Sequence, residues 1–272
     1  MTIVLAAVAG ALIGLSLGAL GGGGSILAVP VLSYLLGQSA VQATTGSLVV
    51  VGVTSVVGAI TAHRASSVLL GRGVAFGVVA IGGALLGGHL STQVPPAVLM
   101  ASFAALMLVI GGVMTWRQLH HSRHPRIATR PALDDPIITF APTFACACPR
   151  ALKVLLTATV VGLLTGFLGV GGGFLVVPAL VLSLGLPIRY AAGTSLVVIT
   201  ITSAAALVAR TGSGASPDWA VVILLTAVSA GAAVLGARFA GKVGNDRLSA
   251  AFTVLVVVVA LYTAARAIPA LL

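Results

Sequence analysis

Acidic residues are almost missing from this chain of 272 residues, which contains four Asp and no Glu. Carboxylate-pair hydrolases, carboxylate-rich metal sites and the acidic relays of many proton pumps all need more carboxylates than this. Cysteine is equally scarce, because Cys146 and Cys148 stand alone in a C-A-C-P context without the further Cys or His of a zinc site. We therefore expect no metal, no cofactor and no catalytic residue, and we do not expect an enzyme.

Charge of either sign is also rare, since charged residues make up 7% of the chain against about 25% in an average soluble domain. Hydrophobic residues make up 59%, and the mean hydropathy is +1.20. The net charge of +10 comes from Lys and Arg between apolar stretches, which is typical of loops on the cytoplasmic side of a membrane. The composition predicts an all-α, polytopic transmembrane helical bundle in the plasma membrane. We expect it to contact the lipid bilayer and to bind no nucleic acid.

The two halves of the chain repeat each other at a shift of 148 positions. Residues 18–32 align with residues 166–180, and nine of the fifteen positions are identical. The same shift brings Ser47 to Ser195 and Thr54-Ser55 to Thr202-Ser203. We therefore predict a duplicated protein with a first transmembrane repeat at 1–117, a polar cytoplasmic linker at 118–149 and a second transmembrane repeat at 150–272.

Each half resolves into five apolar segments, of which most match the roughly 20 residues that a membrane-spanning helix needs. The expected segments are 3–20, 25–37, 43–62, 73–91 and 97–116 in the first half, and 152–168, 174–186, 191–209, 219–240 and 249–265 in the second. A glycine cluster separates the first two segments of each half, and glycine is a poor helix former. The short segments are therefore expected to be half-helices or tilted helices, with Pro30 and Pro178 supporting a defined break.

The positive-inside rule distinguishes two topologies. If each Gly-broken pair enters and leaves on one side or crosses twice, the two repeats are inverted, and 12 of the 14 basic residues lie in the cytoplasm, with Arg210 and Arg266 outside. If the pair crosses once, the repeats are parallel and 10 of the 14 basic residues lie in the cytoplasm. Inversion is favoured, with both chain ends outside.

The glycine clusters are the candidate binding elements. Backbone N–H groups at a helix N-terminus bind anions, and secondary transporters build substrate sites from pairs of broken helices. The predicted substrate-binding residues are Gly23, Gly24, Ser25, Ser47, Gly171, Gly172, Gly173, Thr194 and Ser195. Two alternatives remain open, since glycines also serve close helix packing, and Ser and Thr hydroxyls also bond to carbonyls of their own helix. Gly83 is interpreted as a packing glycine that tolerates alanine.

The doubled block G-x-x-G-x-G-G-[SG]-x-L-x-V-P-x-L, at 18–32 and 166–180, resembles the TauE/SafE family of sulfite and organosulfonate exporters. Each copy is followed by a further matching element that ends at Leu48 or Leu196. The resemblance implies a permease of the bacterial inner membrane that exports small sulfur-containing anions, and together with the repeats it predicts binding at the repeat interface. An anion channel and a membrane assembly factor without transport activity remain as alternatives.

Overall fold

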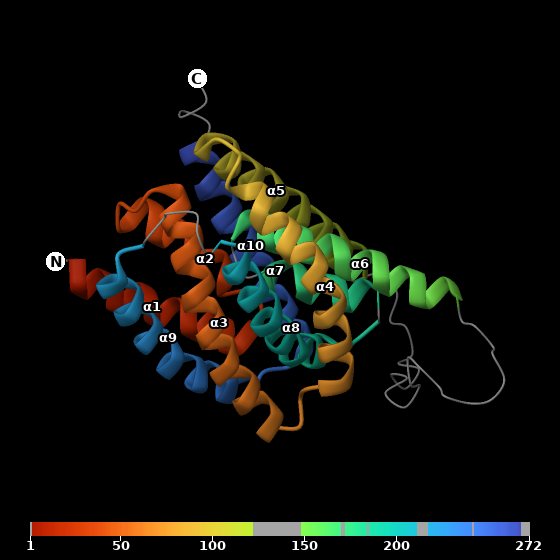
Figure 1. Cartoon of the computed structure of the whole chain (residues 1–272). Coiled ribbons are helices and arrows are strands. Elements are labelled where there is room, and N and C mark those ends of the chain that lie inside the picture. Colours follow the sequence, from red (N-terminus) through yellow and green to blue (C-terminus); the bar gives the residue numbers. More distant parts are fainter. Residues whose placement is uncertain are drawn as a thin grey trace.

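The computed structural model describes residues 2–121, 148–169, 172–183, 185–210, 217–240 and 242–267, so most of the polar linker lies outside the described residues. All regular elements in these ranges are helices (Figure 1), which confirms the all-α prediction. They are α1 (Thr2–Leu20), α2 (Ser25–Pro30), the π-helical turn η1 (Val31–Leu35), α3 (Ala40–Arg64), α4 (Leu70–Ser91), α5 (Pro96–His121), α6 (Cys148–Leu168), α7 (Gly173–Ser183), α8 (Ile188–Ala209), α9 (Trp219–Ala240) and α10 (Asn245–Ala267).

Seven helices in the described part of the chain are long and apolar enough to cross a membrane: α1, α3, α4, α5, α8, α9 and α10. The α2–η1 segment and the apolar part of α6 are shorter. This set confirms the predicted polytopic membrane protein. The two prolines differ from the expectation, because Pro178 lies within the continuous helix α7, and Pro30 ends α2 where the chain widens into η1. The breaks themselves lie at the glycines that precede α2 and α7.

Helices from different halves of the sequence pack closely through glycine. A Cβ on Gly14 of α1 would overlap the carbonyl oxygen of Ser229 in α9, and a Cβ on Gly162 of α6 would overlap that of Ala80 in α4. Such backbone contacts bring two membrane helices together where lipid offers no hydrophobic driving force. The first helix of each half therefore packs on the fourth helix of the other half.

The expectation that Gly83 tolerates alanine is wrong. Its Cβ would overlap the carbonyl oxygen of Thr159 in α6, so Gly83 belongs to the same close contact between α4 and α6. Gly82, the next residue, has nothing within 4 Å of an added Cβ.

Helices α3 and α8 cross antiparallel in the middle of the molecule. Going up α3, Thr44 bonds Arg210, Gly52 packs on Ser203, and Gly58 packs on Leu196, so the partner numbers fall as the α3 numbers rise. These two helices are the third of each half. Their opposite directions support the predicted inversion of the two halves, which remains a prediction, as do the proposed domain limits.

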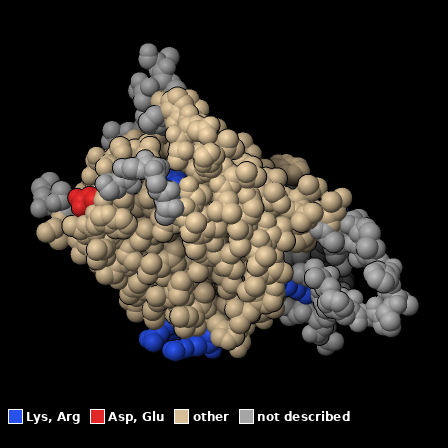
Figure 2. All heavy atoms as spheres, viewed as in Figure 1, with Lys and Arg blue, Asp and Glu red and all other residues tan. Residues whose placement is uncertain are grey.

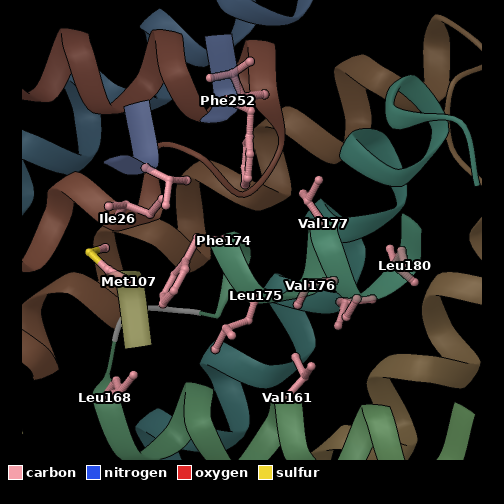
Figure 3. Close-up of a cluster of buried hydrophobic side chains, with 14 of the residues drawn as sticks. Ile26, Met107, Val161, Leu168, Phe174, Leu175, Val176, Val177, Leu180 and Phe252 are labelled. Atoms are coloured by element: carbon pink, nitrogen blue, oxygen red, sulfur yellow. The ribbon is translucent and has the colours of Figure 1, made fainter. Parts of the chain in front are cut away.

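The short helices α2 and α7 lie inside the bundle. Figure 3 shows apolar side chains from both halves converging around α7, among them Ile26, Met107, Phe174 and Phe252. Phe174 also meets Phe103 of α5 edge to face, with ring centroids 6.0 Å apart. The broken segments are thus surrounded by protein, which satisfies the requirement that irregular backbone be kept away from lipid.

Basic side chains gather at one end of the bundle, called here the basic end. It comprises Arg64, Arg72, Arg189, Arg238, Lys242 and Arg247, of which all but the half-buried Arg72 are exposed. Figure 2 shows Lys and Arg along the lower edge of the molecule, below the α3–α4 connection and the end of α9. The start of α8 lies here too, because a Cβ on Gly193 would overlap the carbonyl oxygen of Ser67. The opposite end carries the start of α3 and the end of α8.

Candidate functional site: the two glycine breaks

Both breaks begin with a glycine in the left-handed region. Gly21 has φ +71° directly after α1, and Gly169, 148 positions later, has φ +64° directly after α6. Side chains with a Cβ rarely adopt this conformation, which is common at the residue that ends a helix. The repeated glycines therefore end the two helices by the same means.

The two breaks touch at Gly22 and Gly173. A Cβ on Gly22 would overlap the carbonyl of Gly173, and a Cβ on Gly173 would lie 2.7 Å from the Cα of Gly22. The same Cβ on Gly173 would lie 2.8 Å from the Oγ of Ser25 and from a methyl group of Ile199. Backbone from both halves thus meets beside α8, with no space between the two glycines in this state.

The other predicted glycines lie elsewhere. Gly24 faces back onto α1, since its Cβ would overlap the carbonyl oxygen of Ile13, and Gly172, at φ +63°, lies against Thr165 of α6. Gly23 lies near Leu20 and Leu255. Gly171 lies outside the described residues. The structure therefore brings Gly173 and Ser25 together, and turns Gly24 and Gly172 towards the helices that precede them.

The predicted hydroxyl groups all have partners within the protein. The Oγ of Ser25 donates to the carbonyl of Gly22 at 2.7 Å, and the Oγ of Ser195 donates to the carbonyl of Ala192 at 2.7 Å. Ser47 donates to the carbonyl of Thr44 at 3.0 Å and also to that of Gly169 in the second break.

Thr194 serves a different role, because its hydroxyl accepts from the backbone N–H of Leu69 at 3.1 Å, just before α4. The four hydroxyls therefore do not converge on one point. Ser25 and Ser47 lie at the breaks, whereas Thr194 holds the α3–α4 connection.

Three further hydroxyls are buried at the crossing of α3 and α8: those of Thr54, Ser55 and Ser203. None of them has a hydrogen-bond partner among the described residues. Ser203 packs on Gly52, and Ile199, one turn before Ser203, touches Gly173. A buried hydroxyl without a hydrogen-bond partner destabilises the folded state. These three hydroxyls are therefore candidate hydrogen-bond donors to a ligand near the contact between the two breaks.

Arg210, at the end of α8, is the functional candidate that sequence reasoning missed, because it was counted as a loop residue. Its side chain is 5% exposed, and among the described residues it is the one buried cation. Its guanidinium donates to the hydroxyl of Thr44 at 2.6 Å and to the carbonyls of Gly166 and Phe167 at 3.1 and 3.4 Å. A full positive charge therefore lies against the second break. One sequence signal pointed to it, because the repeat places Arg210 opposite an apolar residue, Ala62, in the first half.

A metal site is not apparent within the described residues, where no three His, Cys or Asp side chains lie close enough together to hold an ion. The groups that remain for binding are backbone amides, hydroxyls and one guanidinium. Such a set can hold an anion through charge-assisted and neutral hydrogen bonds.

Comparison with known proteins gives a consistent picture. The family model described as "Sulfite exporter TauE/SafE" matches residues 6–263. Two proteins named "Probable membrane transporter protein", from the Temecula1 and 9a5c strains of Xylella fastidiosa, are 33% and 31% identical to this chain over 191 residues, covering 70% of this chain and 67% of each relative. No solved structure matches the chain. With seven membrane-length helices among its described residues, the protein is thus a multi-pass cell-membrane transporter that belongs to the TauE/SafE family.

Proposed function

We propose that this transporter exports small sulfur-containing oxyanions, sulfite or organosulfonates, and binds them where the two glycine breaks meet. The observation that carries the proposal is the contact between Gly22 and Gly173 beside the α3–α8 crossing. Polar backbone from two broken helices at the centre of a membrane bundle is the arrangement from which secondary transporters build their sites.

The chemistry around this contact favours an anion. Ser55 and Ser203 hold hydroxyl donors that no described group accepts, and Arg210 adds a positive charge at the second break. No Asp lies within the apolar spans of the membrane-length helices that the structure describes, because Asp218 and Asp246 precede the spans of α9 and α10, so a bound anion meets no like charge in those spans. An oxyanion needs several donors and no negative neighbour, and this region offers both.

In this state the path is closed, because the two breaks are in contact. Binding therefore requires the α1–α2 and α6–α7 segments to separate by about the width of the anion. Glycine suits such a contact, since two backbones without Cβ atoms can meet, part and meet again at one point. A ligand that binds the separated state shifts the equilibrium towards it.

The proposal is tested by flux measurements on the purified protein in liposomes, with sulfite, sulfate, thiosulfate, sulfoacetate and chloride offered separately. We expect saturable flux and counterflow with sulfite or sulfoacetate. Flux that rises linearly with anion concentration would indicate a channel, and no flux of any anion would contradict transport of this class. Either result overturns the proposal.

A matched pair of variants tests the site. Gly173→Ala should abolish flux, because the new methyl group would lie 2.7 Å from the Cα of Gly22 and would keep the two breaks from closing again after they part. Gly231→Ala should leave flux unchanged, because nothing lies within 4 Å of its Cβ. Ser25→Ala, a milder change at the same contact, should raise the KM for the anion about tenfold, the effect of losing roughly 1.4 kcal/mol. Normal flux in both Gly173→Ala and Ser25→Ala would move the site elsewhere.

A further inference from the structure

Arg210 and its three hydrogen-bond partners each have a counterpart 148 positions away in the other half. Arg210 lies against Thr44, Gly166 and Phe167. The counterparts in the other half are, in the same order, Ala62, Ala192, Gly18 and Ala19. Ala62 of the first half therefore stands where the second half has Arg210, and Ala192 of the second half stands where the first half has Thr44.

These four counterparts all line one cavity. It lies at the basic end of the bundle, because Ser67 and Arg189 also line it, together with Ala65, Gly193 and Ala240. The position that the guanidinium fills at one end of the bundle is thus lined by small residues at the other end, around a cavity of about 30 Å³. The two equivalent positions differ because position 210 carries an arginine side chain and position 62 carries an alanine.

The cavity favours anions electrostatically. Arg189 is the one charged residue of its lining, and two further basic-end residues, Arg64 and Arg238, directly neighbour lining residues in the sequence. A hollow with low-dielectric walls and cations of one sign raises the local concentration of anions. Its floor reaches Ala192, which is also the residue in contact with Gly21 of the first break.

We infer that the cavity at Ala62 is the binding site through which a small oxyanion approaches the breaks from the basic end, and that Arg210 closes the opposite end of the same path. The inference rests on the proposed function, since it names the two ends of the anion path. Arg210 ties together the end of α8, the start of α3 and the end of α6, so the path is open on one side and closed on the other. An anion that reaches the breaks can leave only when Arg210 releases Thr44 and the two carbonyls.

The first test probes the cavity without requiring transport. In a Cys146→Ser, Cys148→Ser background, Ala62→Cys should react with an impermeant maleimide that carries a sulfonate, applied to the basic end, and sulfoacetate at saturating concentration should slow the reaction at least fivefold. Sulfite is not used as the protecting anion, because it cleaves disulfides and adds to the maleimide double bond. No reaction, or reaction that sulfoacetate does not slow, overturns the inference.

The second test fills the cavity with the arginine that the other half carries. Ala62→Arg combined with Ala192→Thr recreates the Arg210–Thr44 pair and should lower flux from the basic end at least tenfold, with an unchanged thermal unfolding midpoint. His63→Arg adds the same charge one residue away on an exposed site outside the lining, and should leave flux unchanged. Equal flux in the filled and control variants overturns the inference, and if the filled variant does not fold, the labelling of Ala62→Cys decides.

The third test concerns Arg210. Uptake from the face opposite the basic end should be slower than from the basic end, and Arg210→Ala should reduce this difference at least tenfold, measured in vesicles of both orientations. An unchanged difference overturns the role of Arg210. Protection of Ala62→Cys by sulfoacetate in a protein with no measurable flux would refute the proposed transport and leave the binding cavity standing.

Discussion

Burial of a guanidinium is unfavourable unless acceptors surround it, and Arg210 illustrates how this requirement is met without a described carboxylate at hydrogen-bond distance. The acceptors of its hydrogen bonds include one hydroxyl from α3 and two carbonyls from the last turn of α6, where the helix dipole is negative. A lysine at this position keeps the charge but loses the planar fork of donors. The residue is therefore both a structural tie between the two halves and the charge nearest the second break.

The buried hydroxyls at the crossing give a prediction at the residue scale. Ser203→Ala and Ser55→Ala should not lower the thermal unfolding midpoint, because these hydroxyls have no described hydrogen bond to lose. If they donate to the anion, the KM of sulfite flux should rise about tenfold, as expected for roughly 1.4 kcal/mol. Unfolding in detergent and flux in liposomes are measured on the same preparation.

Thr202→Val is the matched control, since the hydroxyl of Thr202 donates to the carbonyl of Val198 at 3.0 Å within α8. Flux should be unaffected by this change. Unchanged KM values in both serine variants would show that the crossing hydroxyls do not contact the substrate.

The carboxylates give a second prediction at this scale. Asp218 lies at the start of α9, where its Oδ1 accepts from the backbone N–H of Ala220 at 3.1 Å. Asp218→Asn should keep this cap and full flux, and Asp218→Ala should cost about 1 kcal/mol of stability while flux is retained. Asn substitutions at the remaining Asp residues, Asp134, Asp135 and Asp246, should also retain flux. Loss of flux in a well-folded Asp→Asn variant would show that transport depends on that carboxylate.

At the scale of elements, glycine serves two separable purposes in this bundle. Gly21 and Gly169 end helices through a left-handed conformation. Gly14 brings α1 into backbone contact with α9, and Gly162 brings α6 into backbone contact with α4. The alternative interpretation of the glycines as packing residues is therefore correct for the long helices. It also applies to Gly24, which lies against α1.

The packing glycines give a prediction for α4. Gly83→Ala should destabilise the protein by about 1 to 3 kcal/mol, because the methyl group meets the backbone of α6. Gly82→Ala, one residue away in open space, should be neutral or stabilising by up to about 1 kcal/mol through helix propensity. Unfolding in detergent measures both, and equal stability of the two variants would contradict the close contact between α4 and α6.

At the scale of the whole molecule, the ends of the bundle differ in charge. Because α3 and α8 run antiparallel, Arg64 at the end of α3 and Arg189 at the start of α8 lie at the same end of the bundle. The positive-inside rule assigns this end to the cytoplasm. Under the proposed export function, the cavity at Ala62 then faces the compartment from which the substrate is taken.

This orientation gives the fourth prediction. In a background without Cys146 and Cys148, Ser66→Cys in the α3–α4 connection should be protected from an impermeant thiol reagent in intact cells. Gln93→Cys, exposed in the α4–α5 connection, should react, because α4 carries the chain to the other side. Reaction at Ser66→Cys with protection at Gln93→Cys would reverse the assigned orientation.

The sequence by itself determined the fold class and the helix limits to within a few residues at most ends. Hydropathy over about 20 residues is a local property that the bilayer imposes on each segment separately, so it can be read without knowing the neighbours. The glycine runs likewise marked where the helices break. The start of α3 at Ala40 was missed by three residues, because polar Ser39 and Gln42 form a reciprocal cap just outside the apolar window.

Only the tertiary structure decided which of these groups meet. The contact between Gly22 and Gly173, the burial of Arg210, the unmet hydroxyls of Ser55 and Ser203 and the difference between Gly82 and Gly83 all arise between segments far apart in the chain. The physical reason is that helix-to-helix contacts depend on rotation and crossing of whole helices, and a change of one residue turns a side chain by about 100°. No local pattern encodes that rotation. The sequence therefore identifies the candidate residues of the site, and the packing of the helices decides which of them come into contact.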